Sequence, residues 1–122
     1  MLYNKETKIV SFENIGVFHQ YKNDTGIKAV IYVEPREFHE LEALHVTNIR
    51  KESASFGAYF LNESVFVYDH NDNAVKNADA FDILMNHKYI NVTASFKILQ
   101  VEDRIKGISY PIIAGNELRI HF

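Results

Sequence analysis

Aromatic and basic side chains recur together in the segments of this sequence that alternate like β-strands. Lys22 directly follows Tyr21, and Tyr32 lies four residues after Lys28 in the next such segment. Single-stranded nucleic acid binds to such surfaces because its bases stack on aromatic rings while Lys and Arg contact its phosphates. Each stacked base contributes about 1–3 kcal/mol. We therefore predict a surface that binds single-stranded nucleic acid, built from Tyr21, Lys22, Lys28, Tyr32, Arg50, Lys51, Tyr59, Lys97, Arg104 and Lys106.

The same aromatic residues have a competing use in the hydrophobic core. The chain contains 9 Phe and 7 Tyr, enough to fill the core of a small β-rich domain. A buried Tyr hydroxyl must find a hydrogen-bond partner, whereas a Phe ring has no such requirement. The Tyr residues are therefore better candidates for the surface than the Phe residues.

One acidic loop has part of the spacing of a calcium site. Asp69, Asn71 and Asn73 occupy the first, third and fifth places of an EF-hand loop. Its sixth place holds Ala74 where a sharp turn needs Gly, and its twelfth holds Ala80 where a bidentate Glu belongs. The loop is therefore expected to cap a helix and not to bind calcium.

Other catalytic and metal-binding patterns do not appear. The 6 His residues include no pair at the helical i, i+4 spacing of a zinc site, and there is no nucleophilic Cys, G-x-S-x-G or phosphate-binding Gly loop. The sequence therefore predicts a binding protein without a metal or cofactor, and not an enzyme.

Length and charge limit the class of protein further. The 122 residues correspond to a single domain spanning 1–122. A net charge of −3 argues against binding duplex DNA through bulk positive charge. The absence of Cys fits a reducing compartment. Residues 1–6 lack the apolar region of a secretory signal, and no apolar run approaches the length of about 18 residues that spans a bilayer. We expect a cytoplasmic protein, in the host cell if a phage encodes it.

Alternation of apolar and polar residues predicts most of the secondary structure. The clearest strand covers 90–100, and 28–33 is apolar on both faces, which predicts a central strand. The segment 37–49 is ambiguous and is assigned a short helical turn followed by a strand. Further strands are expected at 8–12, 17–21, 56–61, 65–68, 108–113 and 118–122, with 62–64 as the turn of a hairpin and 114–116 as a turn between the last two.

One helix is expected at about 74–87. Ala78, Phe81 and Met85 keep helical spacing there, and the polar loop before it offers N-cap residues. The elements together predict a mainly β fold (β-rich α+β), either an OB-like barrel or a small antiparallel sandwich with this one helix.

The order of elements from Phe66 to Phe122 resembles the C-terminal half of the small single-stranded DNA-binding proteins of φ29-like bacteriophages. The matching pieces are His87-Lys88, Phe96-Lys97-Ile98 and Lys106-Gly107. Pro111 departs from the pattern, since it must lie at a strand edge or a bulge. The resemblance implies an OB-like barrel that coats single strands without catalysis, with Lys97 and Lys106 contacting the backbone.

Two other functions fit the same sequence. The first is a protein–protein interaction module, such as a phage-encoded inhibitor of a host defence protein or a subunit of a virion or ring, or a homo-oligomer. Its acidic composition and strand edges near Pro111 and 118–122 would suit this role. The second is a pocket that binds a small nucleotide by stacking.

Overall fold

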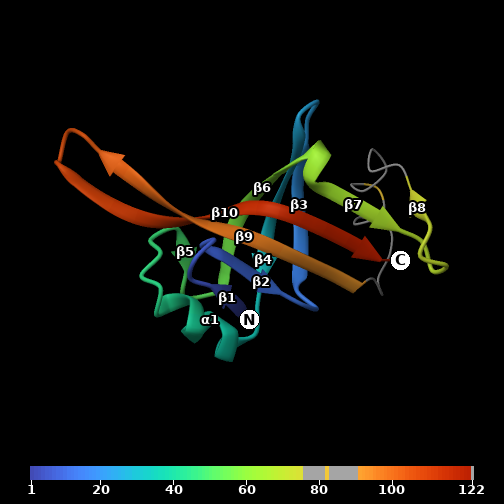
Figure 1. Cartoon of the computed structure of the whole chain (residues 1–122), viewed down its shortest axis with the longest axis horizontal. Helices are drawn as coiled ribbons and strands as arrows, with labels where there is room; N and C mark the ends of the chain where they lie inside the picture. Colours follow the sequence, from blue (N-terminus) through green and yellow to red (C-terminus); the bar gives the residue numbers. More distant parts are fainter. Residues whose placement is uncertain (76–81, 83–90, 122) are drawn as a thin grey trace.

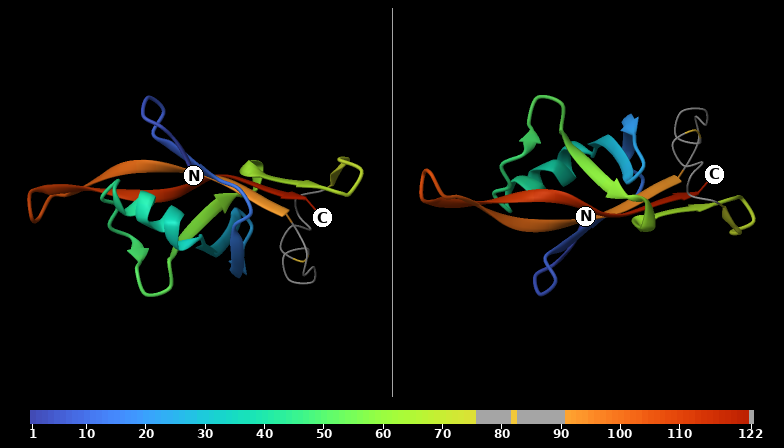
Figure 2. Two further views of the ribbon diagram at one scale, coloured as in Figure 1. Left: turned by 90° about the horizontal axis from the view of Figure 1, so that it is seen from below. Right: turned by 90° about the horizontal axis from the view of Figure 1, so that it is seen from above.

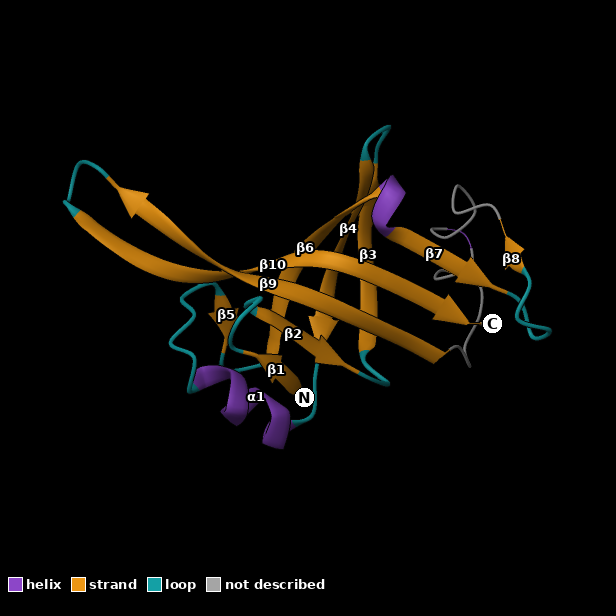
Figure 3. Cartoon of the chain, viewed as in Figure 1, coloured by secondary structure: helices purple, strands orange, loops and turns teal. Residues whose placement is uncertain are grey.

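The computed structural model describes residues 1–75, 82 and 91–121. Its strands form two sheets that pack face to face and do not close into a barrel within the described residues. Figure 1 shows the strands of the smaller sheet crossing behind those of the larger one, and Figure 3 shows that strands dominate. The predicted mainly β fold is confirmed, and of its two forms the sandwich is the one observed.

The larger sheet has six strands in the order β1-β2-β9-β10-β7-β8, and the smaller has four in the order β3-β4-β6-β5. In chain order the elements are β1 (Leu2–Asn4), β2 (Ile9–Phe12), β3 (Gly16–Lys22), β4 (Gly26–Tyr32), α1 (Pro35–Glu42), β5 (Ile49–Arg50), β6 (Ser55–Leu61), the 3₁₀ turn η1 (Asn62–Ser64), β7 (Val65–Tyr68), β8 (Ala74–Val75), β9 (Asn91–Asp103) and β10 (Ile108–His121).

The core between the sheets is built from Phe rings and branched aliphatic side chains. Phe56 packs edge-on against Phe96, with ring centroids 4.9 Å apart, and Phe12 contacts both rings. Every fully buried aromatic side chain in the described part of the chain is Phe. The different placement of Phe and Tyr follows from the hydroxyl group, which keeps each described Tyr in contact with water or a polar partner.

Two strand predictions are confirmed in their positions. β4 lies between β3 and β6, in the interior of its sheet, as its two apolar faces predicted. β9 buries Val92, Ala94 and Phe96 on one face, in the predicted alternation. The ambiguous segment 37–49 does contain a helix, α1, which buries Phe38 and Leu41. The strand predicted after it is wrong except at its end, because 44–48 is a turn and β5 begins only at Ile49.

The predicted hairpin of 56–61 and 65–68 is wrong. η1 carries the chain from one sheet to the other, so β6 and β7 do not pair. β7 instead pairs in parallel with the end of β10, where Val65 lies opposite Leu118. This arrangement buries Val65 and Val67 in the common core, and a short polar segment is compatible with a 3₁₀ turn as well as with a hairpin loop.

The turn predicted at 114–116 is also wrong, because β10 continues through it with a β-bulge between Gly115 and Glu117. A Cβ atom on Gly115 would lie 2.4 Å from the carbonyl oxygen of Tyr59. This glycine therefore marks a place where the backbones of the two sheets approach closely, and not a chain reversal.

The helix predicted at about 74–87 does not begin where expected. Ala74 and Val75 form β8, which pairs antiparallel with β7. The polar loop before β8 closes this hairpin, with the Asp69 carboxylate accepting hydrogen bonds from the backbone N–H groups of Asn71 (2.8 Å) and Asn73 (2.9 Å). Asp82 is helical, and the other residues of the predicted helix, 76–81 and 83–87, lie outside the described residues.

β9 and β10 continue beyond the other strands as a two-stranded arm, residues 99–112. The arm projects from the body in all the views of Figures 1 and 2. At its tip, Gly107 has a φ of 66° and the Asp103 side chain accepts hydrogen bonds from the backbone of Ile105 and Lys106. Among the described residues, no helix is long and apolar enough to cross a membrane.

Candidate nucleic-acid interface

The outer face of the four-stranded sheet is the surface turned away from the core. Along β4, Ile27, Ala29 and Ile31 point into the core and are completely buried. The alternate positions, including Lys28 and Tyr32, must point outward because successive strand residues face opposite ways. This outer face, which we call the aromatic face, carries all three tyrosines of the predicted site.

Strand register arranges the aromatic face in rows. Tyr21 on β3, Lys28 on β4 and Tyr59 on β6 lie opposite one another and form the first row. The second row is Phe18, Val30 and Gly57, and the third is Gly16, Tyr32, Ser55 and Arg50. Neighbouring strands are about 4.8 Å apart and successive rows about 6.7 Å apart, so the four aromatic rings lie within reach of a few consecutive nucleotides.

A β-bulge in β3 brings two of these rings to the same side. Phe18 lies opposite Val30 and Tyr21 opposite Lys28, with the register shift between His19 and Tyr21. In a regular strand, residues three apart point to opposite faces, so the extra residue of the bulge is what aligns them. Phe18 and Tyr21 are 58% and 50% exposed. Phe18 could not be predicted from the sequence, because the alternation of residues gives no sign of the bulge.

Tyr59 is held in place by the turn between β3 and β4. Its hydroxyl donates a hydrogen bond of 2.7 Å to Asn23 Oδ1 and also contacts the Thr25 hydroxyl. The same Asn23 oxygen accepts hydrogen bonds from the backbone N–H groups of Thr25 and Gly26. The turn predicted at 23–26 is therefore present. It fixes the ring at one end of the first row before any ligand arrives.

Lys28 places a positive charge in the middle of the rings. Its ammonium group lies over Gly57, where a Cβ atom would be only 3.0 Å from Lys28 Nζ. The missing side chain of Gly57 thus leaves room for the ammonium between the first and third rows. Within the described part of the chain, Lys28 makes no ion pair. An anion over this part of the sheet would be its natural counter-ion.

The structure brings together five of the ten predicted residues. Tyr21, Lys28, Tyr32, Arg50 and Tyr59 all belong to the aromatic face. The other five lie elsewhere. Lys22 is opposite Ile27, so it lies on the other side of β3 from the aromatic face. Lys51 forms an ion pair with Glu42 at 3.6 Å.

The remaining three predicted residues lie on the six-stranded sheet. Lys97 is an exposed residue of β9 between Ile9 and Ala114. Arg104 and Lys106 are in the turn at the tip of the arm. None of the three shares a sheet with Tyr21, so one bound strand cannot contact all ten predicted residues on a single face.

A second group of polar and aromatic side chains lies on the outer face of the six-stranded sheet. The Arg119 guanidinium is stacked over the Phe66 ring at 4.8 Å and donates to the Tyr68 hydroxyl, while Glu117 pairs with it at 3.3 Å. This group could not be predicted from the sequence, because β7 and β10 meet only through their parallel pairing.

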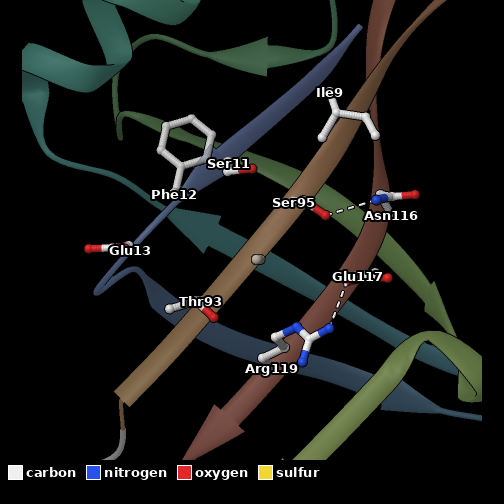
Figure 4. A pocket seen from close by; sticks show the side chains of 10 residues that line it. Ile9, Ser11, Phe12, Glu13, Thr93, Ser95, Asn116, Glu117 and Arg119 are labelled. Carbon is white, nitrogen blue, oxygen red and sulfur yellow. Dashed lines mark hydrogen bonds and ion pairs between the residues drawn. The ribbon is translucent and has the colours of Figure 1, made fainter. Parts of the chain in front are cut away.

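Beside Arg119 is a hollow of about 430 Å³. Figure 4 shows it across β2, β9 and β10, with Glu13 and Glu117 on either side and a hydrogen bond between Asn116 and Ser95. Its lining is Ile9, Ser11, Phe12, Glu13, Thr93, Ala94, Ser95, Asn116, Glu117 and Arg119. Two carboxylates against one guanidinium make this hollow a poor site for the phosphates of a nucleotide. In the described residues, no three His, Asp or Glu side chains gather as a metal site.

No protein-family model, curated protein or solved structure matches this chain significantly. The resemblance to the φ29-like phage proteins therefore stays a prediction.

Proposed function

We propose that this protein binds single-stranded nucleic acid across the aromatic face. The observation that carries the proposal is the row Tyr21–Lys28–Tyr59, in which two aromatic rings flank a lysine on three neighbouring strands. Phe18 and Tyr32 extend the aromatic surface to the next two rows. Aromatic side chains on an open sheet can each stack one base, and such platforms accept about two or three bases.

The same chemistry accounts for the absence of strong positive charge. Stacking supplies affinity without cations, at about 1–3 kcal/mol for each base. Lys28 and Arg50 then contact one or two phosphates and hold the strand in register across the sheet. Stacking has little preference among bases, so the binding is expected to be largely independent of sequence.

Duplex DNA fits this surface poorly. Its bases are stacked on one another and cannot reach the rings, and the net charge of −3 provides little attraction for two phosphate backbones. We accordingly propose discrimination in favour of single strands, in a cytoplasmic setting where such strands arise. Whether a phage or a bacterium encodes the chain does not alter this chemistry.

The proposal is tested by fluorescence anisotropy with labelled oligothymidylate over a range of salt concentrations. Two phosphate contacts on a single strand predict a slope of log K against log salt of about −1.4. Phe18→Ala and Tyr21→Ala should each weaken binding about 5- to 150-fold, which is the loss of one stacked base. Phe18 is more than half exposed and Tyr21 is half exposed, so removal of either ring leaves the core intact.

Matched controls come from the other sheet. Leu2→Ala removes a large apolar side chain that is 77% exposed, and Lys5→Gln removes a surface charge from the β1–β2 turn. Neither should alter binding. Absence of binding at low salt, or equal losses in the controls and in the aromatic-face variants, would overturn the proposal.

A further inference from the structure

The arm has one apolar face and one polar face. Because Ile98 and Ile113 pack toward the core, the alternate residues of β9 and β10 point away from it. The outward residues of the arm are Leu99, Val101, Ile108, Tyr110 and Ile112, and those on the opposite side include Gln100, Glu102 and Ser109. Leu99 is 43% exposed and Ile108 is 53% exposed. An amphipathic ribbon that projects from the body indicates a surface that another molecule covers.

The outward residues follow a pattern that is complementary to itself. From base to tip the cross-strand rows are Lys97 with Ala114, Leu99 with Ile112, Val101 with Tyr110, and Asp103 with Ile108. A cation thus begins the series, two apolar rows follow, and an anion ends it. When the series is reversed, the anion faces the cation and the apolar rows face each other. A parallel arrangement would instead bring Lys97 onto Lys97 and Asp103 onto Asp103.

The tip of the arm and the hollow at its base are complementary as well. Ile105 is 98% exposed, between Arg104 and Lys106. The hollow beside β9 has Ile9 and Ala94 among its apolar lining and Glu13 and Glu117 at its sides (Figure 4). Suppose that Lys97 of one copy lies over Asp103 of a second copy. Two residues farther along, Ser95 of the first copy then lies opposite Ile105 of the second. Ser95 lines this hollow.

We propose that the occupant of the arm is a second copy of this chain. Two arms lie face to face and antiparallel about a two-fold axis, with their Leu99 and Val101 side chains in contact near the axis. Lys97 of each copy pairs with Asp103 of the other, and each Ile105 enters the hollow of the other body. Arg104 and Lys106 then approach the carboxylates of Glu13 and Glu117. Because the two copies are related by a two-fold axis, each of these contacts occurs twice.

The charges on the arm favour a second copy over an anionic partner. Arg104 and Lys106 are balanced at the tip by Glu102 and Asp103, so the tip offers no net attraction to a lipid headgroup or a phosphate backbone. A second copy, in contrast, provides an opposite charge for each sign at the tip, with Lys97 for Asp103 and with Glu13 and Glu117 for the two cations. The inference is independent of nucleic-acid binding, because the arm and the aromatic face belong to different sheets.

The first test measures mass in solution by light scattering with size-exclusion chromatography. The unaltered chain should have twice the mass of 14.1 kDa. Val101→Asp places a charge in the centre of the apolar face and should give a monomer, whereas Gln100→Asp places the same charge on the opposite face and should remain a dimer. Circular dichroism of both variants establishes that they are folded. A monomeric unaltered chain, or equal behaviour of the two variants, would overturn the proposal.

The second test uses the absence of Cys from the sequence. In the variant Ser95→Cys/Ile105→Cys, the two thiols of one chain are ten positions apart along β9 and its turn, about 30 Å. They cannot form a disulfide within one copy but would meet between two copies. Mild oxidation should therefore produce a covalent dimer on a non-reducing gel. The single variants Ser95→Cys and Ile105→Cys serve as controls and should give far less.

Several results of this second test would reject the arrangement. Covalent dimer in the single variants at the level of the double variant would show random collision. A dimer by light scattering without cross-linking would show that another surface forms the contact. If vesicles containing anionic lipid or an oligonucleotide bind the arm and Val101→Asp abolishes that binding while the unaltered chain stays monomeric, the occupant is that partner and not a second copy.

Discussion

The Tyr59 hydroxyl donates a hydrogen bond to the side-chain oxygen of Asn23, 2.7 Å away. This bond connects β6 to the turn between β3 and β4. The Asn23 oxygen accepts from two backbone N–H groups at the same time. One side-chain carbonyl thus fixes both the shape of the β3–β4 turn and the orientation of an aromatic ring on the proposed binding surface.

Asn23→Ala should lower both stability and binding. Loss of these hydrogen bonds is expected to reduce the free energy of unfolding by about 1–2 kcal/mol, measured by urea denaturation. Release of the Tyr59 ring should also weaken oligonucleotide binding. Asn23→Asp keeps the oxygen acceptor and should retain most of the stability. If Asp and Ala at this position are equally destabilising, the acceptor role assigned to Asn23 is wrong.

Gly115→Ala should be far more damaging than the same change in another strand. A Cβ atom at 115 would lie 2.4 Å from the backbone oxygen of Tyr59, which cannot move without displacing β6. We expect a loss of about 1–3 kcal/mol or more in thermal or denaturant unfolding. Gly57→Ala is the matched control, because its Cβ would meet only the flexible end of Lys28 and should change stability by about 0.5 kcal/mol or less.

Asn48 completes the edge of β10 with its side chain. Its amide group donates to the Ile113 carbonyl at 2.8 Å and accepts from the Ile113 N–H at 2.9 Å, as a neighbouring strand would. Asn48→Ala should cost about 1–3 kcal/mol, because it leaves part-buried backbone groups without partners. Hydrogen exchange at the Ile113 amide should accelerate in this variant. Unchanged protection of that amide would mean that the side chain does not hold the edge.

Asp69 should contribute to an acid-sensitive β7–β8 hairpin. Hydrogen bonds from the Asn73 and Asn71 backbones hold the pKa of this carboxyl below its ordinary value. A depressed pKa gives a stabilising contribution that is present above the unfolded-state pKa and is lost as pH falls through the folded-state value. Its side-chain resonances in NMR should therefore titrate below 3.8. Asp69→Asn removes this titration and should flatten the acid limb of the stability curve.

Local patterns in the sequence predict local structure well. The alternation of Val92, Ala94 and Phe96 defines β9 and its buried face, because a strand with one face in the core must alternate. The unlike chemistry of Phe and Tyr likewise predicts that the fully buried rings are Phe, although it does not predict the exposure of Phe18. These features depend only on neighbours in the chain.

Features that depend on distant neighbours could not be predicted. Nothing near Val65 indicates that its partner is Leu118, and the short polar segment before it is equally typical of a hairpin loop. Gly115 lies in an Ala-Gly-Asn segment that is typical of a turn, yet its lack of a side chain is required by the nearby Tyr59 backbone. Phe18 joins the candidate site only through a bulge, which shifts register without a distinctive residue type.

The parallel pairing of β7 with β10 also has a consequence for how the chain folds. β7 cannot acquire that neighbour until the residues up to His121 have left the ribosome, so this edge stays open while the segment between β7 and β10 is being made. Pairings between segments this far apart in sequence form slowly, since the loop entropy is lost before the contacts are made. We therefore expect the β7–β10 pairing to form late and slowly. The nascent chain would then expose an unpaired edge that chaperones or a neighbouring chain could capture.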